Sequence, residues 1–301
     1  MQVFRHFPKQ KSPACALAIG NFDGMHLGHQ ALLASMTATA KARNLHSAVM
    51  TFEPHPREFF AAQTAPARLS SLREKLEYFA EAGVEKCYVC RFNQAFAKIT
   101  PVQFMHGILR ESVNAQAILV GDDFRFGAQR AGSVADFIEA KFDLLSLPQV
   151  DLNGQRVSST RVREALASGD LSQASTLLNR PYSISGKVVH GAKRGRQLGF
   201  PTANVHMRHE RPALTGVYAV KLDGLPAVAN LGVRPTIAGI AKLLLEVHVL
   251  DFAGDLYGKH VHVAFLHKIR DEMKFESLSA LQAQIEKDVA VAREIFEIRH
   301  D

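Results

Sequence analysis

The chain is poor in cysteine, in long apolar runs and in any leader-like start, and each absence narrows what the protein can be. Three cysteines in 301 residues are too few for the disulfide framework of a small secreted protein. No apolar run approaches the roughly 20 residues that a bilayer-spanning helix needs. The first residues, Met1–Lys9, lack the apolar core of a signal peptide. We therefore expect a cytoplasmic protein with no membrane partner.

Two of the three cysteines, Cys87 and Cys90, form a CxxC sequence of the kind found in metal and redox sites. They lie in residues 84–92, an apolar segment that predicts a buried strand. Residues three apart in a strand point to opposite faces, and the sequence contains no second CxxC. These cysteines are therefore expected to be two separate buried thiols.

Composition predicts a folded protein of two ordinary domains. Hydrophobic residues make up 47% and charged residues 22% of the chain, as in globular proteins, and its length suffices for two domains. The net charge of +7 is spread over both halves, whereas nucleic-acid binders usually concentrate their basic residues. Small anionic substrates suit this charge, and we expect no nucleic-acid partner.

The first 180 residues alternate strand-like and helix-like segments, which predicts a doubly wound parallel sheet. Capping boxes mark helix starts at Ser71 and Thr100, and Pro101 occupies the first position of the second helix. Ligands of such sheets bind at the carboxyl ends of the strands. The expected strands are 14–19, 47–52, 84–89, 117–120 and 144–147.

A different pattern begins after Pro181, beyond two short helices expected at 160–167 and 171–178. Short β-like runs separated by glycine and proline turns indicate a small antiparallel barrel. A final amphipathic helix is expected from about Ser279, with its apolar stripe packed on the barrel. We predict two domains, residues 1–180 and 181–301.

The turn at residues 20–29, GNFDGMHLGH, joins an expected strand to an expected helix. Backbone N–H groups and the positive end of a helix converge at such a turn, which suits a phosphate. His26 and His29 are three apart and share a helix face. Two imidazoles there can hydrogen-bond phosphate oxygens while a phosphoanhydride breaks, although either histidine alone is more often a cap or a surface residue.

The whole ten-residue pattern resembles the Gly-x-Phe-Asp-x-x-His-x-Gly-His signature of the HxGH nucleotidyltransferases, and every fixed position is present. The resemblance implies a doubly wound domain that transfers an adenylyl group. It makes His26 and His29 catalytic residues. The residues that it implies for ATP binding are Gly20, Phe22, Asp23 and Gly28.

Residues 157–163, VSSTRVR, open the helix expected near the end of the first domain. Serine or threonine there can simply cap the helix. The segment is also similar to the Ser-Ser-Thr-x-x-Arg element of the same nucleotidyltransferases. That resemblance makes Arg163 a catalytic residue at the β- and γ-phosphates and assigns ATP binding to Ser158, Ser159 and Thr160.

Two further loops follow strands of the first domain, at residues 51–56 and 121–127. Each can be an ordinary turn, because proline stiffens the first and glycine bounds the second. Both resemble the flavin-adenylating branch of the nucleotidyltransferases. The flavin contacts implied are Phe52, His55, Asp122, Asp123 and Phe124.

The second half opens with a dense motif at residues 186–204, in which glycines and basic residues alternate. Such a loop can wrap a polyphosphate, but a basic glycine loop by itself is as often RNA-binding or merely solvated. Thr202 and Asn204 are hard oxygen donors that suit Mg²⁺ held together with substrate phosphates. The segment 199–204, GFPTAN, is similar to the signature of riboflavin kinases. The phosphate-binding residues implied are Gly186, Gly191, Arg196, Gly199 and Pro201.

Glu246 is the one acidic residue in an apolar strand, and it either faces solvent or serves as a base. A kinase needs a carboxylate to accept the proton of the attacking hydroxyl. The segments 230–236 and 246–248 are similar to riboflavin kinase elements, which implies that Glu246 is the catalytic base. The resemblance also assigns flavin contacts to Asn230 and Arg270.

Taken over residues 14–298, the chain resembles the bacterial bifunctional riboflavin kinase/FAD synthetases. This implies ATP as co-substrate, Mg²⁺ as cofactor, and riboflavin, FMN and FAD as ligands. Two alternatives stay open: an adenylyltransferase for another phosphorylated acceptor, and a flavin- or RNA-binding regulator without turnover. The sequence leaves the oligomeric state open.

Overall fold

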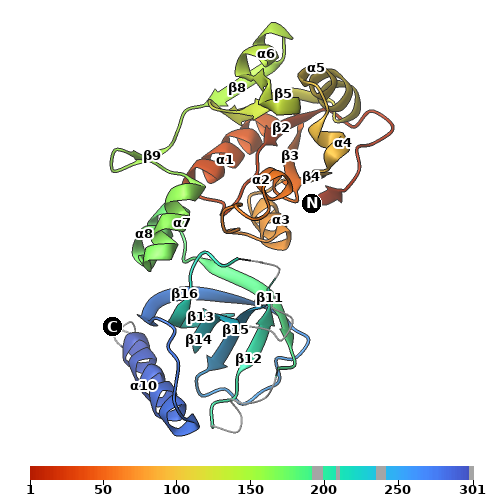
Figure 1. Ribbon diagram of the computed structural model, residues 1–301. Coiled ribbons are helices and arrows are strands. Elements are labelled where there is room, and N and C mark those ends of the chain that lie inside the picture. Colours follow the sequence, from red (N-terminus) through yellow and green to blue (C-terminus); the bar gives the residue numbers. More distant parts are fainter. Residues whose placement is uncertain (192–198, 208–210, 235–241, 298–301) are drawn as a thin grey trace. The chain divides into compact units, whose positions relative to one another are not determined.

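The computed structural model describes residues 1–191, 199–207, 211–234 and 242–297, and the chain forms two compact units (Figure 1). The first unit comprises residues 1–66 and 72–158, and the second comprises residues 67–71 and 159–301. Helices α7 (Ser159–Ser168) and α8 (Leu171–Leu178) belong to the second unit, because they pack on each other and α8 also packs on strand β16 (His260–Arg270). The units thus divide before α7, whereas we placed the domain boundary after α8.

The first unit is built on a six-stranded parallel sheet with strand order β1-β4-β3-β2-β5-β8. Five of its strands were predicted, and the edge strand β1 was not. The strands are β1 (Gln2–Phe4), β2 (Cys15–Ile19), β3 (His46–Glu53), β4 (Lys86–Arg91), β5 (Ala115–Gly121) and β8 (Asp143–Leu147). Two short antiparallel pairs are added by β6 (Arg125–Phe126) with β7 (Gly132–Ser133) and by β9 (Asp151–Leu152) with β10 (Gln155–Arg156).

Helices cover both faces of this sheet, which confirms the predicted doubly wound fold (Figure 1). The predicted capping box at Thr100 is present, and Pro101 begins the helix. The helices are α1 (Leu27–Ala42), α2 (Pro56–Phe60), α3 (Leu72–Glu81), α4 (Gln94–Ala97), α5 (Pro101–Gln103), a π-helix η1 (Phe104–Ser112), a 3-10 turn η2 (Ala128–Arg130) and α6 (Val134–Glu139).

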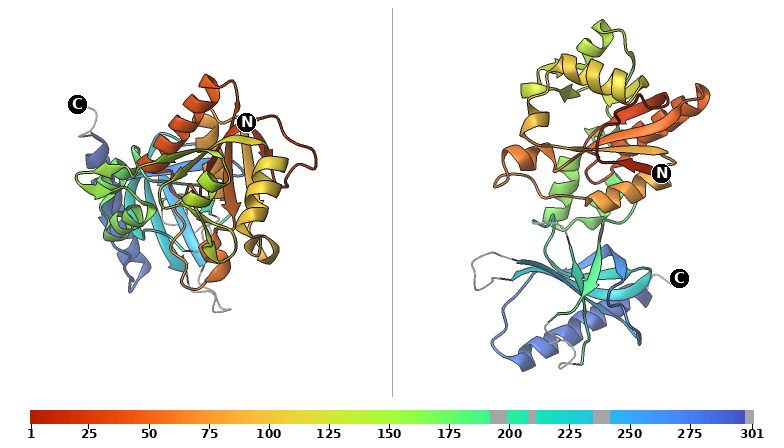
Figure 2. Two further views of the ribbon diagram at one scale, coloured as in Figure 1. Left: turned by 90° about the horizontal axis from the view of Figure 1, so that it is seen from above. Right: turned by 90° about the vertical axis from the view of Figure 1, so that its right-hand side faces the viewer.

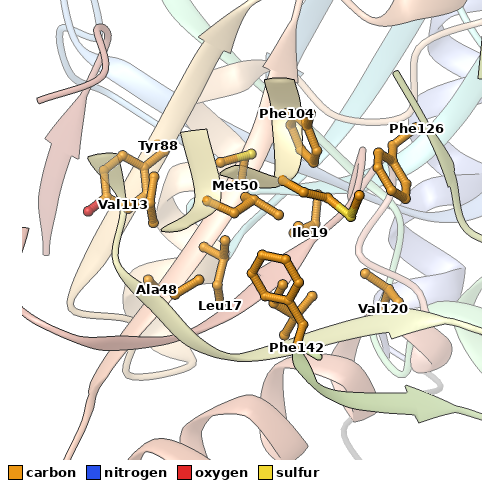
Figure 3. Packing of buried hydrophobic residues seen from close by; sticks show 14 of the residues in the cluster. Leu17, Ile19, Ala48, Met50, Tyr88, Phe104, Val113, Val120, Phe126 and Phe142 are labelled. Atoms are coloured by element: carbon orange, nitrogen blue, oxygen red, sulfur yellow. The ribbon is translucent and has the colours of Figure 1, made fainter. Parts of the chain in front are cut away.

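Alternate residues of the central strands pack into two separate hydrophobic cores, one on each face of the sheet. Leu17 and Ile19 of β2 pack with Met50 and Phe142 on one face (Figure 3), and Ala16 and Ala18 pack on the other face. Cys87 lies in one core and Cys90 in the other. The predicted placement of two buried thiols on opposite faces of the strand is therefore confirmed. Burial raises the pKa of the Cys87 thiol to about 12, which keeps it in the weakly nucleophilic thiol form.

The second unit contains a closed barrel with strand order β11-β12-β15-β14-β13-β16, as the pattern predicted. Its strands are β11 (Ser183–Val189), β12 (Ala203–His206), β13 (Gly216–Leu222), β14 (Leu225–Arg234), β15 (Lys242–Val249) and β16. Helix α10 (Leu278–Glu297) runs along the outside of the barrel (Figure 2), where Ala292 and Phe296 pack on Val217, Ala219 and Val228. Within the described ranges, no helix combines the length and the apolar character needed to cross a bilayer.

Candidate active sites

The turn after β2 is held by the neighbouring strand β3. The N–H of Gly20 donates to the carbonyl of Met50 at 3.1 Å, and the buried Thr51 hydroxyl donates to the carbonyl of Asn21 at 3.3 Å. The chain then reverses through Phe22, which is fully buried at φ 51°, and Gly24, at φ 82°. A glycine is suited to such a left-handed position. The turn therefore leads into α1 with a fixed direction.

The two histidines of this turn stack at the start of α1, as their spacing predicted. His26 is the N-cap residue, and its Nδ1 accepts a hydrogen bond from the N–H of His29 at 3.4 Å. The two rings lie 3.7 Å apart and nearly parallel. A Cβ on Gly28 would lie 3.2 Å from the His26 ring, so any larger residue at position 28 would crowd that ring. Asp23 is buried in the same turn.

Burial decides the charge of His29. The pKa of His29 lies well below its usual value. The main cause is burial, which disfavours the charged ring, and the nearby His26 and Lys75 add repulsion against a positive charge on His29. Its Nδ1 is buried without a hydrogen-bond partner in the described part of the chain. A neutral imidazole with an open nitrogen, beside the N–H groups of a helix start, is ready to bind a phosphate oxygen.

This charge state predicts a specific acid sensitivity. Below about pH 6.5 the unfolded chain protonates His29, whereas the folded protein, with its lowered pKa, does not. The free energy of unfolding should therefore decrease as the pH falls through this range, because the unfolded state binds the extra proton. Urea unfolding between pH 7 and 5 should show a shallower decrease for His29→Asn than for the unmodified protein. Equal pH dependence in both proteins would contradict the assignment.

An aromatic pocket of about 520 Å³ lies at the carboxyl edge of the same sheet. It brings together Phe52, Asp123 and Phe124, which were predicted flavin contacts, with Gly20 of the turn. Asp123 is also paired with Arg156 at 2.7 Å. Aromatic residues that line the pocket and that the sequence did not reveal are Phe60, Phe92, Phe96, Phe104 and Phe126. The only hint of this pocket in the sequence was the aromatic composition, which has nineteen phenylalanines but five tyrosines and no tryptophan.

Two of the predicted flavin contacts, His55 and Asp122, are not among the residues that line this pocket. His55 caps α2, where its Nδ1 accepts a hydrogen bond from the N–H of Arg57 at 3.1 Å and Glu58 completes a capping box. Asp122 is exposed in the turn after β5. His55 therefore shapes the loop beside the pocket, because the cap fixes the start of α2.

The predicted second phosphate element lies at the start of α7, in the other unit. Ser159 begins the helix, and Thr160 in its first turn is exposed. Arg163 is partly buried, and its Nε donates to the carbonyl of Ala67 at 2.5 Å. Ala67, which is distant from Arg163 in sequence, thus anchors the arginine.

In the barrel, three predicted site residues align across neighbouring strands. Asn204 of β12 pairs with Glu246 of β15, and Glu246 pairs with Asn230 of β14. Directly paired residues of antiparallel strands project on the same face. We call these three residues the polar row. It places the carboxylate of Glu246 between two amides, on the face opposite to that of the buried Leu245 and Val247.

Gly191 packs tightly against Asn204, at one end of the polar row. A Cβ on Gly191 would collide with the side chain of Asn204, and one on Gly186 would collide with the carbonyl of His206. Thr202 lines a small pocket of about 120 Å³ together with Asp255 and Tyr257. Pro201 accepts a hydrogen bond from His248 at 2.9 Å, and Gly199 has φ 87°. Arg196 lies outside the described residues.

Arg270 is held by the terminal helix. Its Nε and Nη2 donate to both carboxylate oxygens of Asp288 in α10 at 2.8–3.1 Å, and Gln284 donates to the same carboxylate. The side chains are 19% and 4% exposed. Arg270 pairs in the barrel with Val217, which pairs with Asn230. The ion pair therefore ties α10 to β16, which β13 separates from the polar row.

Asp288→Ala should destabilise the protein by about 3 kcal/mol, because it leaves a partly buried guanidinium without its partner. The matched control is Asp251→Ala, which breaks the exposed pair between Asp251 and Arg293 on the same helix. That change should leave the thermal midpoint nearly unaltered. Calorimetry of both variants tests this, and similar midpoints would show that Arg270 needs no carboxylate.

The fold and the two sites define a class: a two-domain enzyme that transfers groups from nucleotides, with stacked histidines at a helix start in one domain and a carboxylate in a barrel in the other. Comparison with known families is consistent with this. Residues 8–161 match the family model for FAD synthetase, and residues 178–296 match that for riboflavin kinase.

Relatives align over almost the whole chain. The bifunctional riboflavin kinase/FMN adenylyltransferase of Escherichia coli K12 is 49% identical and the alignment covers 94% of this chain and 93% of that protein. The one from Pseudomonas fluorescens is 46% identical, with 97% of each covered. A crystal structure from Streptococcus pneumoniae, named as a macrolide-efflux protein, is 31% identical, covers 97% of this chain and 99% of its own, and has a TM-score of 0.81. The chain therefore belongs to the family of bifunctional riboflavin kinase/FMN adenylyltransferases.

Proposed function

We propose that the chain converts riboflavin to FMN and FMN to FAD, with one ATP-dependent step in each domain. The observation that carries the second step is the pair of stacked histidines at the same sheet edge as a phenylalanine-lined pocket. A flavin ring is large, flat and apolar, so the pocket suits it. The acceptor phosphate then lies toward the turn where ATP phosphates bind.

In the adenylyl transfer, a phosphate oxygen of FMN attacks the α-phosphorus of ATP and pyrophosphate leaves. No covalent enzyme intermediate is required, so positioning and charge stabilisation suffice. His26 and His29 donate hydrogen bonds to the phosphates. The N–H groups at the start of α1, which Gly20, Phe22, Asp23 and Gly28 shape, hold the ATP. We propose that Ser158, Ser159, Thr160 and Arg163 also bind ATP phosphates, at the start of α7.

In the kinase step, the terminal hydroxyl of the riboflavin side chain attacks the γ-phosphorus of ATP. The new oxygen–phosphorus bond forms as the bond to the β–γ bridging oxygen breaks, and Glu246 accepts the hydroxyl proton. Asn204 and Asn230 flank the carboxylate in the polar row. Their amides orient it and the flavin hydroxyl.

The oxygen donors Thr202 and Asn204 suit Mg²⁺. Thr202 and Asn204 supply neutral oxygens, and Asp255 lines the same pocket as Thr202. Oxygen donors of this kind hold Mg²⁺ together with phosphate oxygens. When bound there, the ion would neutralise charge on the ATP phosphates, while the chain's own residues place the hydroxyl and take its proton.

The first test is to incubate the purified protein with riboflavin, ATP and Mg²⁺ and to separate the flavins over time. FMN that appears first and FAD that follows would establish both steps. FMN alone would confine the activity to the barrel. Parallel reactions with pantetheine phosphate test the other acceptor class, and strong salt-dependent RNA affinity without turnover would favour a regulator.

A further inference from the structure

Asn21 lines the aromatic pocket and carries a hydrogen-bond acceptor without a partner among the described residues. Its side-chain oxygen Oδ1 is buried and has no hydrogen-bond partner among the described residues, and Asn21 lines the pocket next to Gly20. A buried acceptor without a donor costs free energy, and native structures seldom keep one without a reason. A bound molecule that brings a donor would remove this cost.

The backbone of Asn21 is fixed on both sides. Thr51, which is itself fully buried, donates to the carbonyl of Asn21, and the next residue, Phe22, packs in the core against Phe79. The backbone that carries the amide is therefore held in place before any ligand arrives. A preorganised polar group of this kind selects among ligands, because it loses little freedom on binding.

The position of Asn21 indicates which part of a ligand it meets. Phenylalanines of the pocket suit the flavin ring, and the turn that starts at Gly20 suits the phosphate. Asn21 belongs to both, since it follows Gly20 and lines the pocket. The part of FMN between its ring and its phosphate is the ribityl chain, which carries hydroxyl donors.

We propose that Asn21 selects FMN by accepting a hydrogen bond from a ribityl hydroxyl through its Oδ1. This inference rests on the proposed adenylyl transfer in the first domain. It makes Asn21 a specificity-determining residue that distinguishes a polyhydroxylated chain from a plain alkyl chain. The ring and the phosphate would bind in the same places in both cases.

The test compares FMN with a flavin phosphate that has an unsubstituted pentyl chain. In the unmodified protein, kcat/KM for adenylyl transfer should favour FMN by about tenfold, the size of one good hydrogen bond. Asn21→Ala should lose this preference. Its FMN complex lacks the hydrogen bond, whereas the pentyl analogue has no hydroxyl and is unaffected by the missing acceptor. Asn21→Asp keeps the acceptor and should keep the preference, although its charge repels the phosphate and lowers both rates.

The control is Gln116→Ala, which removes an exposed amide on β5 and should leave both rates and their ratio unchanged. The same FMN-to-analogue ratio in the unmodified protein and in Asn21→Ala would overturn the inference, because a purely structural role alters both substrates equally. Absence of FAD from FMN in the unmodified protein would instead count against the proposed adenylyl transfer. The two failures are therefore distinguishable.

Discussion

Glu246→Gln is expected to lower the rate of FMN formation by about 10²–10⁴-fold, the usual contribution of a general base. The amide keeps the size and the place of the carboxylate in the polar row, but it cannot accept the hydroxyl proton. The conversion of FMN to FAD should stay close to its normal rate, because that step takes place in the other domain. Separate assays that start from riboflavin and from FMN measure the two effects.

The matched control for this change is Glu294→Gln, which alters an exposed carboxylate on α10 and should affect neither reaction. Parallel loss of both activities in Glu246→Gln would show that the two domains do not act independently. Unchanged FMN formation would show that Glu246 is not the catalytic base. It would then be a strand residue that faces solvent, the alternative that the sequence left open.

The stacked histidines were predictable because every determinant is local. A strand, a glycine-containing turn and a helix start follow one another within residues 15–29, so the order of residue types carries the geometry. The neutral state of His29 was not predictable in this way. It depends on burial and on Lys75, which reaches the site from α3, far along the chain.

The polar row shows a second limit of sequence reasoning. Motif resemblance pointed to Asn204, Asn230 and Glu246 one by one. Their alignment is a matter of strand register, and a slip of one residue would send Glu246 to the opposite face. That register is set by the pairing of β12, β15 and β14, which no local pattern reports.

The aromatic pocket and the anchoring of Arg270 were missed for a related reason. Phe60, Phe92, Phe96 and Phe104 come from separate segments and meet only when the sheet edge forms. Arg270 resembled a flavin contact in the sequence, but its partner Asp288 lies 18 residues away on another element. Long-range ion pairs have no signature in a single sequence.

His29→Ala is expected to produce the reverse of the Glu246 effect. FAD formation from FMN should fall by about 10²–10³-fold, because one hydrogen-bond donor to the transition-state phosphates is lost. FMN formation from riboflavin should be unaffected. The loss should appear in kcat more than in the KM for FMN, since we propose that the acceptor's ring binds in the phenylalanine-lined pocket rather than at His29.

Two comparisons separate chemistry from folding in this variant. His46→Ala removes an exposed histidine that pairs with Glu85, and it should leave FAD formation intact. His29→Asn keeps a polar side chain in the stacked position and should keep the thermal midpoint while losing activity. An unchanged adenylyl-transfer rate in His29→Ala would show that its open nitrogen does not contact the phosphates. Catalysis would then rest on His26 and the N–H groups at the start of α1.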